Sequence, residues 1–285
     1  MIKLLALDLD GTLLNSSGKI PEANKLAIQA AEKKGVLVTI ATGRRFRDAR
    51  PVALEIELNA PVVCHNGALL KYAQSLETVA VELIEPDTVF EILRVGKSFG
   101  GDALVSCNPK TKGTLLYESI SDENIPLQKY VAWSKRLHGD EAEESVLRVE
   151  SLAQTVGNEK VIHISFSGCC QPMYDLQRFL EDELGDSVNI LATIYPQLDF
   201  TLLDILPPHA SKAHGLHQLA LSNGFSAENV MAIGDNYNDL EMLEYAGTSI
   251  IMGNASPELL EREEFFATVS NDESGVALAI EKFIL

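Results

Sequence analysis

The chain has 285 residues, 46% of them hydrophobic, so it can bury a sizeable core and is too apolar to be disordered. Its formal net charge of -18, from 41 acidic and 23 basic residues, creates a field that repels a nucleic-acid backbone. We therefore expect no nucleic-acid partner. An anionic substrate would need a local source of positive charge, and a divalent cation held by carboxylates is one such source.

Cysteine usage and hydropathy bear on the compartment. The four cysteines show no C-x-x-C spacing, and in a chain of this length they do not indicate a disulfide framework. Asp8 and Asp10 interrupt the N-terminal apolar run before it could serve as a signal-peptide core, and no stretch of about 18 apolar residues predicts a membrane span. We expect a cytoplasmic protein without a membrane partner, either a monomer or a homodimer.

Apolar runs alternate with helical patterns at both ends of the chain. Residues 2–9 and 36–41 are predicted strands that flank a predicted helix over 21–34. Near the C-terminus the same rhythm returns, with helices over 211–223 and 240–245 and strands over 230–233 and 248–252. Strand-helix-strand units of this kind predict one α/β domain with a parallel sheet that helices cover on both faces.

The middle of the chain has a different pattern. Predicted helices over 87–99, 127–137 and 171–184 alternate with predicted strands over 103–107, 113–118 and 161–166. In the last strand Ile162, Ile164 and Phe166 share one face, and His163 and Ser165 share the other, which indicates a sheet with one solvated face. We expect an inserted α+β domain over residues 84–195, with residues 1–83 and 196–285 forming the core.

The first polar motif is D-L-D-G-T, which begins at Asp8, directly after the first strand. Along an extended chain Asp8 and Asp10 point the same way, so both can face one pocket at the carboxyl end of the sheet. Solvated turn aspartates are the alternative. In a shared pocket one carboxylate can attack phosphorus while the other transfers the proton. Gly11 would let backbone amides approach the transferring group.

The second motif, T-G-R at residues 42–44, follows the next strand of this domain. The Thr42 hydroxyl and the Gly43 amide could donate hydrogen bonds to a phosphoryl oxygen, although Thr-Gly ends many strands. Arg44 could sense the substrate's charge or form a structural ion pair. These residues predict a phosphate-binding loop.

The third motif, G-D-N-Y-N-D at residues 234–239, follows the strand predicted over 230–233. Asp235 and Asp239 can both lie near the N-terminal end of the next helix and offer the hard oxygen ligands that Mg²⁺ prefers. A helix N-cap and a polar first turn are the alternatives. Lys212 begins the preceding helix, where its ammonium group could reach Asp8 and a bound phosphate.

The ordered conjunction of these motifs resembles the haloacid dehalogenase superfamily, and more closely its Cof-like hydrolases. The resemblance covers essentially the whole chain, including N-G-A at residues 66–68, the large insertion and S-N-D-E-S-G-V-A at residues 270–277. It implies a Rossmann-like core with a cap domain that supplies substrate selectivity. The family usually has Lys-Gly at the lysine motif, whereas here Ala213 follows Lys212, which leaves the helix start less certain.

The resemblance also implies a role for each motif residue. It implies that Asp8 forms an aspartyl-phosphate and that Asp10 is the general acid and base, with Thr42 and Lys212 binding the phosphoryl group. Mg²⁺ would be held by Asp8, the backbone carbonyl of Asp10, Asp235 and Asp239, the last directly or through water. The remaining candidates for substrate or phosphate contacts, or for ordering the acidic loop, are Gly11, Gly43, Arg44, Asn66 and Asn238.

The resulting function is a magnesium-dependent phosphatase for small phosphorylated metabolites of the sugar phosphate, pyridoxal phosphate or FMN type. Two alternatives stay open: a phosphosugar mutase of the same fold, and a regulatory module that binds a phosphorylated metabolite without turnover. A pure binding module does not need both Asp8 and Asp10, which favours an enzyme.

Overall fold

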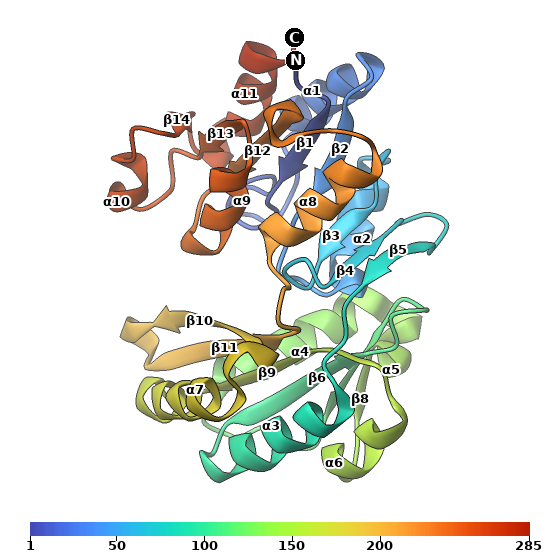
Figure 1. Cartoon of the computed structure of the whole chain (residues 1–285), viewed down its shortest axis with the longest axis vertical. Coiled ribbons are helices and arrows are strands. Elements are labelled where there is room, and N and C mark those ends of the chain that lie inside the picture. The colour runs from blue at the N-terminus through green and yellow to red at the C-terminus, as the bar shows by residue number, and fades with distance from the viewer. The chain divides into compact units, whose positions relative to one another are not determined.

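In the computed structural model, which describes all 285 residues, contacts divide the chain into two units. Unit 1 consists of Met1–Arg44, Ala49–Val79 and Ser211–Leu285, and unit 2 consists of Arg45–Asp48 and Ala80–Ala210. Each unit contains its own large sheet (Figure 1). No helix is both long and apolar enough to span a membrane.

The sheet of unit 1 is parallel, with the strand order β14-β13-β12-β1-β2. Its strands are β1 (Leu4–Leu7), β2 (Leu37–Ile40), β12 (Val230–Gly234), β13 (Thr248–Ile251) and β14 (Phe266–Ala267). The central strand β1 is buried along its whole length, which explains why its sequence is continuously apolar. Figure 1 shows β12, β1 and β2 side by side, so their carboxyl ends meet at one edge.

Helices and a small second sheet complete unit 1. Helix α1 (Glu22–Lys33) packs against α11 (Gly275–Phe283), and α8 (Lys212–Ser222) packs against α9 (Leu240–Tyr245). Its other helices are α10 (Pro257–Leu260) and most of α2 (Phe46–Glu55). The small sheet contains β3 (Val62–Cys64), β4 (Leu69–Lys71) and β5 (Thr78–Val81), of which the first two residues belong to unit 1. A bridge between Ala41 and Val63 places β3 beside the end of β2.

The sheet of unit 2 has the order β10-β11-β9-β6-β7-β8 and is antiparallel except between β7 and β8. Its strands are β6 (Asp102–Cys107), β7 (Thr114–Tyr117), β8 (Val146–Arg148), β9 (Val161–Gly168), β10 (Asn189–Tyr195) and β11 (Phe200–Leu206). Its helices are α3 (Pro86–Ser98), α4 (Ile125–His138), α5 (Ala142–Ser145), α6 (Leu152–Thr155) and α7 (Cys170–Leu184).

Two apolar clusters hold unit 2 together, one on each face of its sheet. On one face Ile92 of α3 and Leu176 of α7 pack with Phe166 of β9. On the other, Leu127 of α4 packs with Leu104 of β6. The same cluster includes Leu115 of β7 and Val146 of β8, so α4 packs beside β6, β7 and β8.

The α/β class, the parallel sheet and the inserted α+β region predicted from the sequence are confirmed. Two details differ. Residues 196–210 were assigned to the core, but β11 pairs with β9 and β10, which places this segment in unit 2. His163 was expected on a solvated face, yet it is only 5% exposed and its Nε2 lies 2.9 Å from Oδ1 of Asp204.

Candidate active site

Three polar loops of unit 1 begin where neighbouring strands end. Leu7 pairs with Ile40 on one side and with Ile233 on the other. The residues just beyond these ends are Asp8, the Thr42 loop and Asp235, so they gather at the carboxyl edge of the sheet. Open α/β sheets bind ligands at this edge.

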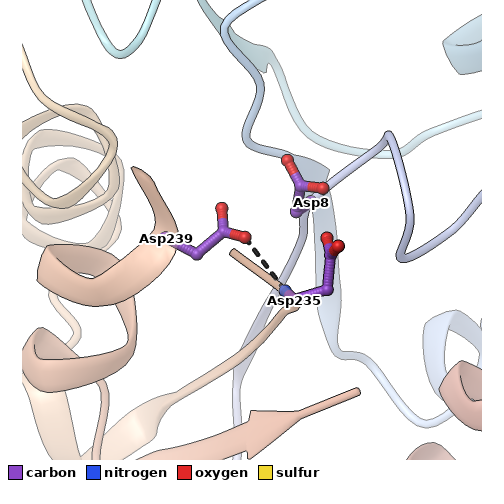
Figure 2. A group of neighbouring side chains, drawn as sticks. All are labelled: Asp8, Asp235 and Asp239. Carbon is purple, nitrogen blue, oxygen red and sulfur yellow. Dashed lines mark hydrogen bonds between the residues drawn. The ribbon is translucent and has the colours of Figure 1, made fainter. Parts of the chain in front are cut away.

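Three carboxylates form the centre of the site (Figure 2). Asp8, Asp235 and Asp239 each offer an oxygen atom within 4.8 Å of the others. Nζ of Lys212 donates to Oδ1 of Asp8 and to Oδ1 of Asp239, at 2.6 Å in both cases. A single ammonium group therefore faces three carboxylates.

The surplus of negative charge perturbs the carboxylates of the centre. Burial and the neighbouring Asp239 raise the pKa of Asp8 well above its ordinary value, even though Lys212 opposes the shift. Burial and Asp239 also raise the pKa of Asp235, to about 6. Burial would lower the pKa of Lys212, but the Asp239 and Asp8 carboxylates raise it. Carboxylates that repel one another in a buried site fit a divalent cation, which would relieve the repulsion.

The oxygen atoms of Asp239 are already engaged. Oδ1 accepts from Lys212, and Oδ2 accepts from the backbone amides of Asp235 and Asn236, at 3.0 and 3.1 Å. Asp239 is fully buried and therefore holds the lysine and the acidic loop together. Asn238, a candidate for ordering this loop, is exposed and makes no side-chain hydrogen bond. The backbone amide of Asn236 orders the loop instead, by its hydrogen bond to Asp239.

Asp235 is held by residues that the sequence did not single out. Thr12 Oγ1 donates to Oδ1 of Asp235 at 3.0 Å. Asn254 Nδ2 donates to the carbonyl of Gly11 at 2.9 Å and lies 3.4 Å from Oδ2 of Asp235. Thr12 could have been found as part of D-G-T, and Asn254 as a polar residue shortly after the apolar strand β13.

Gly11 is required by the geometry of this loop. Its φ is +85°, and a Cβ atom at this position would lie 2.4 Å from Oδ2 of Asp235. Only glycine combines this backbone conformation with such a close approach. The first and third motifs are therefore in direct contact, because the strands that precede them, β1 and β12, are neighbours in the sheet.

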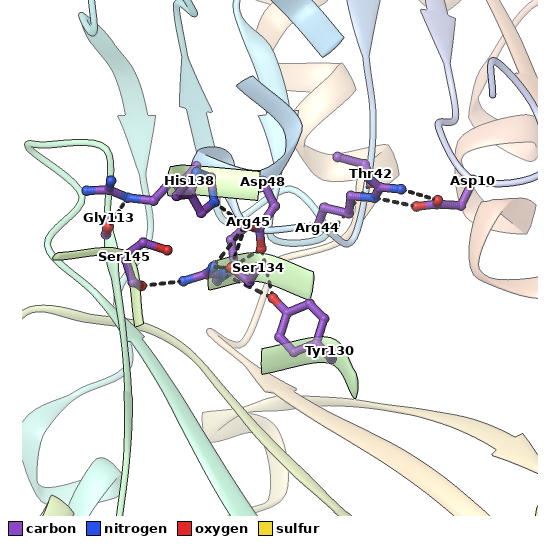
Figure 3. A network of polar contacts seen from close by, with 11 residues as sticks. Asp10, Thr42, Arg44, Arg45, Asp48, Gly113, Tyr130, Ser134, His138 and Ser145 are labelled. Atoms are coloured by element: carbon purple, nitrogen blue, oxygen red, sulfur yellow. Dashed lines mark hydrogen bonds and ion pairs between the residues drawn. The ribbon is translucent and has the colours of Figure 1, made fainter. Parts of the chain in front are cut away.

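Asp10 pairs with Arg44 (Figure 3). Arg44 Nε donates to Oδ2 of Asp10 at 2.7 Å, and the second guanidinium donor binds Oδ1. The side chain of Asp10 is 59% exposed, unlike that of Asp8. Arg44 thus forms an ion pair with Asp10, the predicted general acid and base. An ion pair is one of the two roles that the sequence suggests for Arg44.

The second motif forms a tight loop beside Asn66. Thr42 is buried, and its Oγ1 accepts from the amide of Arg44 at 3.1 Å, which leaves the hydroxyl hydrogen free to donate. Asn66 is 3% exposed and lies against Gly43, where an added Cβ would be 3.1 Å from its Oδ1. Lys212 is the first residue of α8, whose N-cap Ser211 accepts from the amide of His214, so the unusual Ala213 leaves the lysine at the helix start.

A second buried charged cluster, in unit 2, begins at Arg45, directly after Arg44 (Figure 3). Arg45 donates to both carboxylate oxygens of Asp48, at 2.7 and 2.9 Å. The same carboxylate accepts from Tyr130 at 2.8 Å and from Ser134 at 3.2 Å, and Nε2 of His138 lies 2.8 Å from it. Burial would raise the pKa of Asp48, but the contacts with His138 and Arg45 hold it well below its usual range.

Comparison with known proteins identifies a family. The stress response protein YhaX of Bacillus subtilis (strain 168) is 34% identical over 290 residues, which cover 99% of this chain and 93% of YhaX. The 5-amino-6-(5-phospho-D-ribitylamino)uracil phosphatase YwtE of the same strain is 29% identical, with 99% and 98% covered. A solved haloacid dehalogenase-like hydrolase from Bacteroides thetaiotaomicron superposes with a TM-score of 0.82 at 25% identity, covering 99% of each chain.

The family model for haloacid dehalogenase-like hydrolases matches residues 5–280, nearly the whole chain. The resemblance to the Cof-like members, drawn from the motifs alone, is confirmed. Asp8 at the end of the first strand and the inserted second unit agree with this match. The chain belongs to the haloacid dehalogenase-like hydrolase family.

Proposed function

We propose that the chain is a Mg²⁺-dependent phosphatase that hydrolyses small phosphorylated metabolites through an aspartyl-phosphate on Asp8. The observation that carries the proposal is the placement of one buried lysine between Asp8 and Asp239, beside the third carboxylate of Asp235. Family membership and the phosphatases among the relatives support a phosphoric monoester hydrolase. Substrates of the sugar phosphate, pyridoxal phosphate or FMN type are our candidates.

In the proposed reaction a carboxylate oxygen of Asp8 attacks phosphorus, and the bond from phosphorus to the ester oxygen breaks. Asp10 gives a proton to the departing oxygen and then takes one from the water that attacks the aspartyl-phosphate, so orthophosphate leaves and Asp8 is restored. Asp10 has to leave its ion pair with Arg44 before it can reach the ester oxygen. Entry of a phosphate dianion, which attracts Arg44, would favour that release.

The residues present fit a divalent cation. We propose Asp8, Asp235 and the backbone carbonyl of Asp10 as the ligands of Mg²⁺. Asp239 completes the acidic group mainly by holding Lys212, because both of its oxygens accept hydrogen bonds from the protein. When bound, Mg²⁺ would neutralise charge on the phosphoryl oxygens.

The phosphoryl oxygens also need donors from the protein. Lys212 and the free hydroxyl hydrogen of Thr42 supply two of them, and we propose the Gly43 amide and the amide group of Asn66 as further contacts. Gly11 leaves room for the transferring group beside Asp235. Donors fixed in advance stabilise the charge that develops in the transition state.

Residues 84–195, together with the rest of unit 2 up to Ala210, would act as the cap domain that selects the organic part of the substrate. Within this proposal the partner is a small phosphorylated metabolite, the protein is cytoplasmic, and it works as a monomer or homodimer. The net charge of -18, which repels nucleic acid, supports a small-molecule role.

The test measures phosphate release from a panel of phosphorylated metabolites with and without Mg²⁺. Asp8→Asn removes the nucleophile and should lower kcat at least about 1,000-fold. Asp48→Asn, an identical change at another buried aspartate, is the matched control and should keep kcat in the folded protein. Isomerised sugar phosphate without release would indicate the mutase, and binding without turnover would indicate the regulatory module.

A further inference from the structure

The turn between β3 and β4 has an unusual backbone. Three consecutive residues have positive φ angles: His65 at +52°, Asn66 at +49° and Gly67 at +91°. Residues other than glycine rarely adopt this conformation, and it persists where the surrounding structure fixes it. His65 and Asn66 are both 3% exposed, so the turn is held inside the protein.

One side of this turn holds the phosphate-binding loop. The His65 amide donates to the carbonyl of Arg44 at 3.0 Å, and the Asn66 amide donates to the carbonyl of Thr42 at 3.1 Å. The Asn66 side chain lies against Gly43 between them. The left-handed conformation of the turn is what directs these two successive amides at the loop.

The other side of the turn contacts the start of helix α8. A Cβ atom on Gly67 would lie 1.9 Å from the carbonyl oxygen of Ser211, the N-cap residue that precedes Lys212. A Cβ atom on Gly215, one turn along the helix, would lie 3.0 Å from Cα of Gly67. Two glycines thus bring the backbone of the turn against the backbone of the helix.

We propose that the turn His65–Gly67 is a positioning element that sets the distance between Thr42 and Lys212, two of the proposed donors to the phosphoryl group. The inference rests on the proposed function and adds His65 and Gly67, which act through other residues without touching the substrate. The same three residues hold the loop by hydrogen bonds and the helix by contact, so a displacement of either partner is passed to the other.

The size of the expected effect follows from the geometry. An alanine at position 67 must move the Ser211 carbonyl from 1.9 Å to at least 3.0 Å from the new Cβ, a shift of about 1 Å at the residue that precedes Lys212. A misplacement of about 1 Å in a catalytic group lowers rates about 100-fold. We expect Gly67→Ala to lower kcat by about that factor and to weaken binding of inorganic phosphate about tenfold in the presence of Mg²⁺.

Gly35→Ala is the matched control. Gly35 has φ +85°, and nothing lies within 4 Å of a Cβ atom at this position, so alanine there adds backbone strain without displacing a neighbour. Both variants should lose thermal stability, but Gly35→Ala should keep kcat and phosphate binding within about twofold. If Gly67→Ala does not fold, Gly215→Ala probes the same contact from the helix side, where the added Cβ would also lie 2.6 Å from Cγ1 of Val63.

A double-mutant cycle tests whether the effect passes through Lys212. Adding Gly67→Ala to Lys212→Met should weaken phosphate binding no further, because the group that was displaced is already absent. The positioning role would be overturned if Gly67→Ala matched Gly35→Ala in phosphate binding and kcat. Full additivity of the two substitutions in the cycle would overturn it as well. An unchanged chain that releases no phosphate from any ester would instead refute the proposed function, and the binding measurements would still decide the role of the turn.

Discussion

Each unit contains a buried charged cluster around an aspartate, and the two clusters differ in how their charges balance. In unit 1 the three carboxylates of Asp8, Asp235 and Asp239 share one cation, Lys212. In unit 2 the single carboxylate of Asp48 has Arg45 and further donors. The pKa of Asp48 is accordingly lowered, whereas those of Asp8 and Asp235 are raised.

The cluster of unit 2 suits stability, whereas the cluster of unit 1 suits the cation binding that we propose. A buried charge whose oxygen atoms are all satisfied rigidifies a fold, and it has nothing left to offer a ligand. A buried site that keeps surplus negative charge is unfavourable on its own and gains when a cation enters. Both clusters consist of aspartate with a basic partner. The number of carboxylates per cation therefore decides which purpose each cluster suits.

Lys212→Met should give the largest effect, because it removes the only cation of the unit 1 cluster. We expect kcat for phosphate release to fall about 1,000-fold as the phosphoryl group loses a donor. Mg²⁺ should bind at least as tightly as before, since the three carboxylates are then uncompensated. Calorimetric titration with Mg²⁺ and steady-state kinetics measure the two quantities. Lys97→Met, on the surface of unit 2, is the control, and weaker Mg²⁺ binding by Lys212→Met would contradict the charge imbalance.

Asp48→Asn probes the balanced cluster and should act on stability. Arg45 would be left as a buried charge without a carboxylate, which costs about 3 kcal/mol of unfolding free energy. Urea denaturation measures the loss, and Asp186→Asn on the surface should change stability by less than about 0.5 kcal/mol. A loss of Mg²⁺ binding in folded Asp48→Asn would show that the two clusters are not separate in function.

Acid should affect the two clusters in opposite directions. Asp235 has a raised pKa of about 6, so without metal the folded protein binds more protons than the unfolded chain between about pH 4 and 6, and stability rises as pH falls through that window. Asp48, with its lowered pKa, keeps its contribution throughout this range and loses it only in stronger acid.

We therefore expect the metal-free protein to gain about 1 kcal/mol from Asp235 on going from pH 7.5 to 5. Stabilisation by Mg²⁺ should be larger at pH 7.5, where Asp235 is ionised. Urea denaturation with a chelator and with Mg²⁺ at both pH values gives these numbers. Asp235→Asn should reduce the gain by this amount, while Asp8, whose pKa is also raised, contributes in the same direction in both proteins. An equal pH trend in both proteins would assign the whole gain to other groups.

The sequence was sufficient to predict that Asp8 and Asp235 lie close together, because each directly follows an apolar strand. Parallel strands bring their carboxyl ends to one edge, so local patterns predicted a contact between residues far apart in the chain. The support from Asn254 was not predictable in this way, since it depends on the path of the loop after β13. Nor could the three positive φ angles at residues 65–67 be derived, because His and Asn adopt this conformation more often than other side chains but still in a minority of cases.

The misplaced border has a physical explanation in the hairpin of β10 and β11. The border predicted between residues 195 and 196 falls at Pro196, and proline often ends an element. In the structure it begins the short 3₁₀ turn Pro196–Leu198 that joins two paired strands, so the proline marks a turn inside unit 2. A proline in the sequence predicts that a strand or helix ends there. Whether the break is a hairpin or a domain border depends on whether the strands before and after it pair with each other.

Asn254→Ala should give the smallest effect and tests how finely the unit 1 cluster is arranged. Its Nδ2 donates to the Gly11 carbonyl and its Oδ1 accepts from the Asn271 amide at 3.0 Å, so it joins the first motif to the C-terminal segment. Losing such support around a ligand carboxylate weakens metal affinity about tenfold. Calorimetry with Mg²⁺ measures this, and Asn223→Ala, which removes only a helix C-terminal contact, should leave affinity unchanged. Equal affinities in the two variants would mean that the charge of the carboxylates alone, without their fixed geometry, determines cation binding.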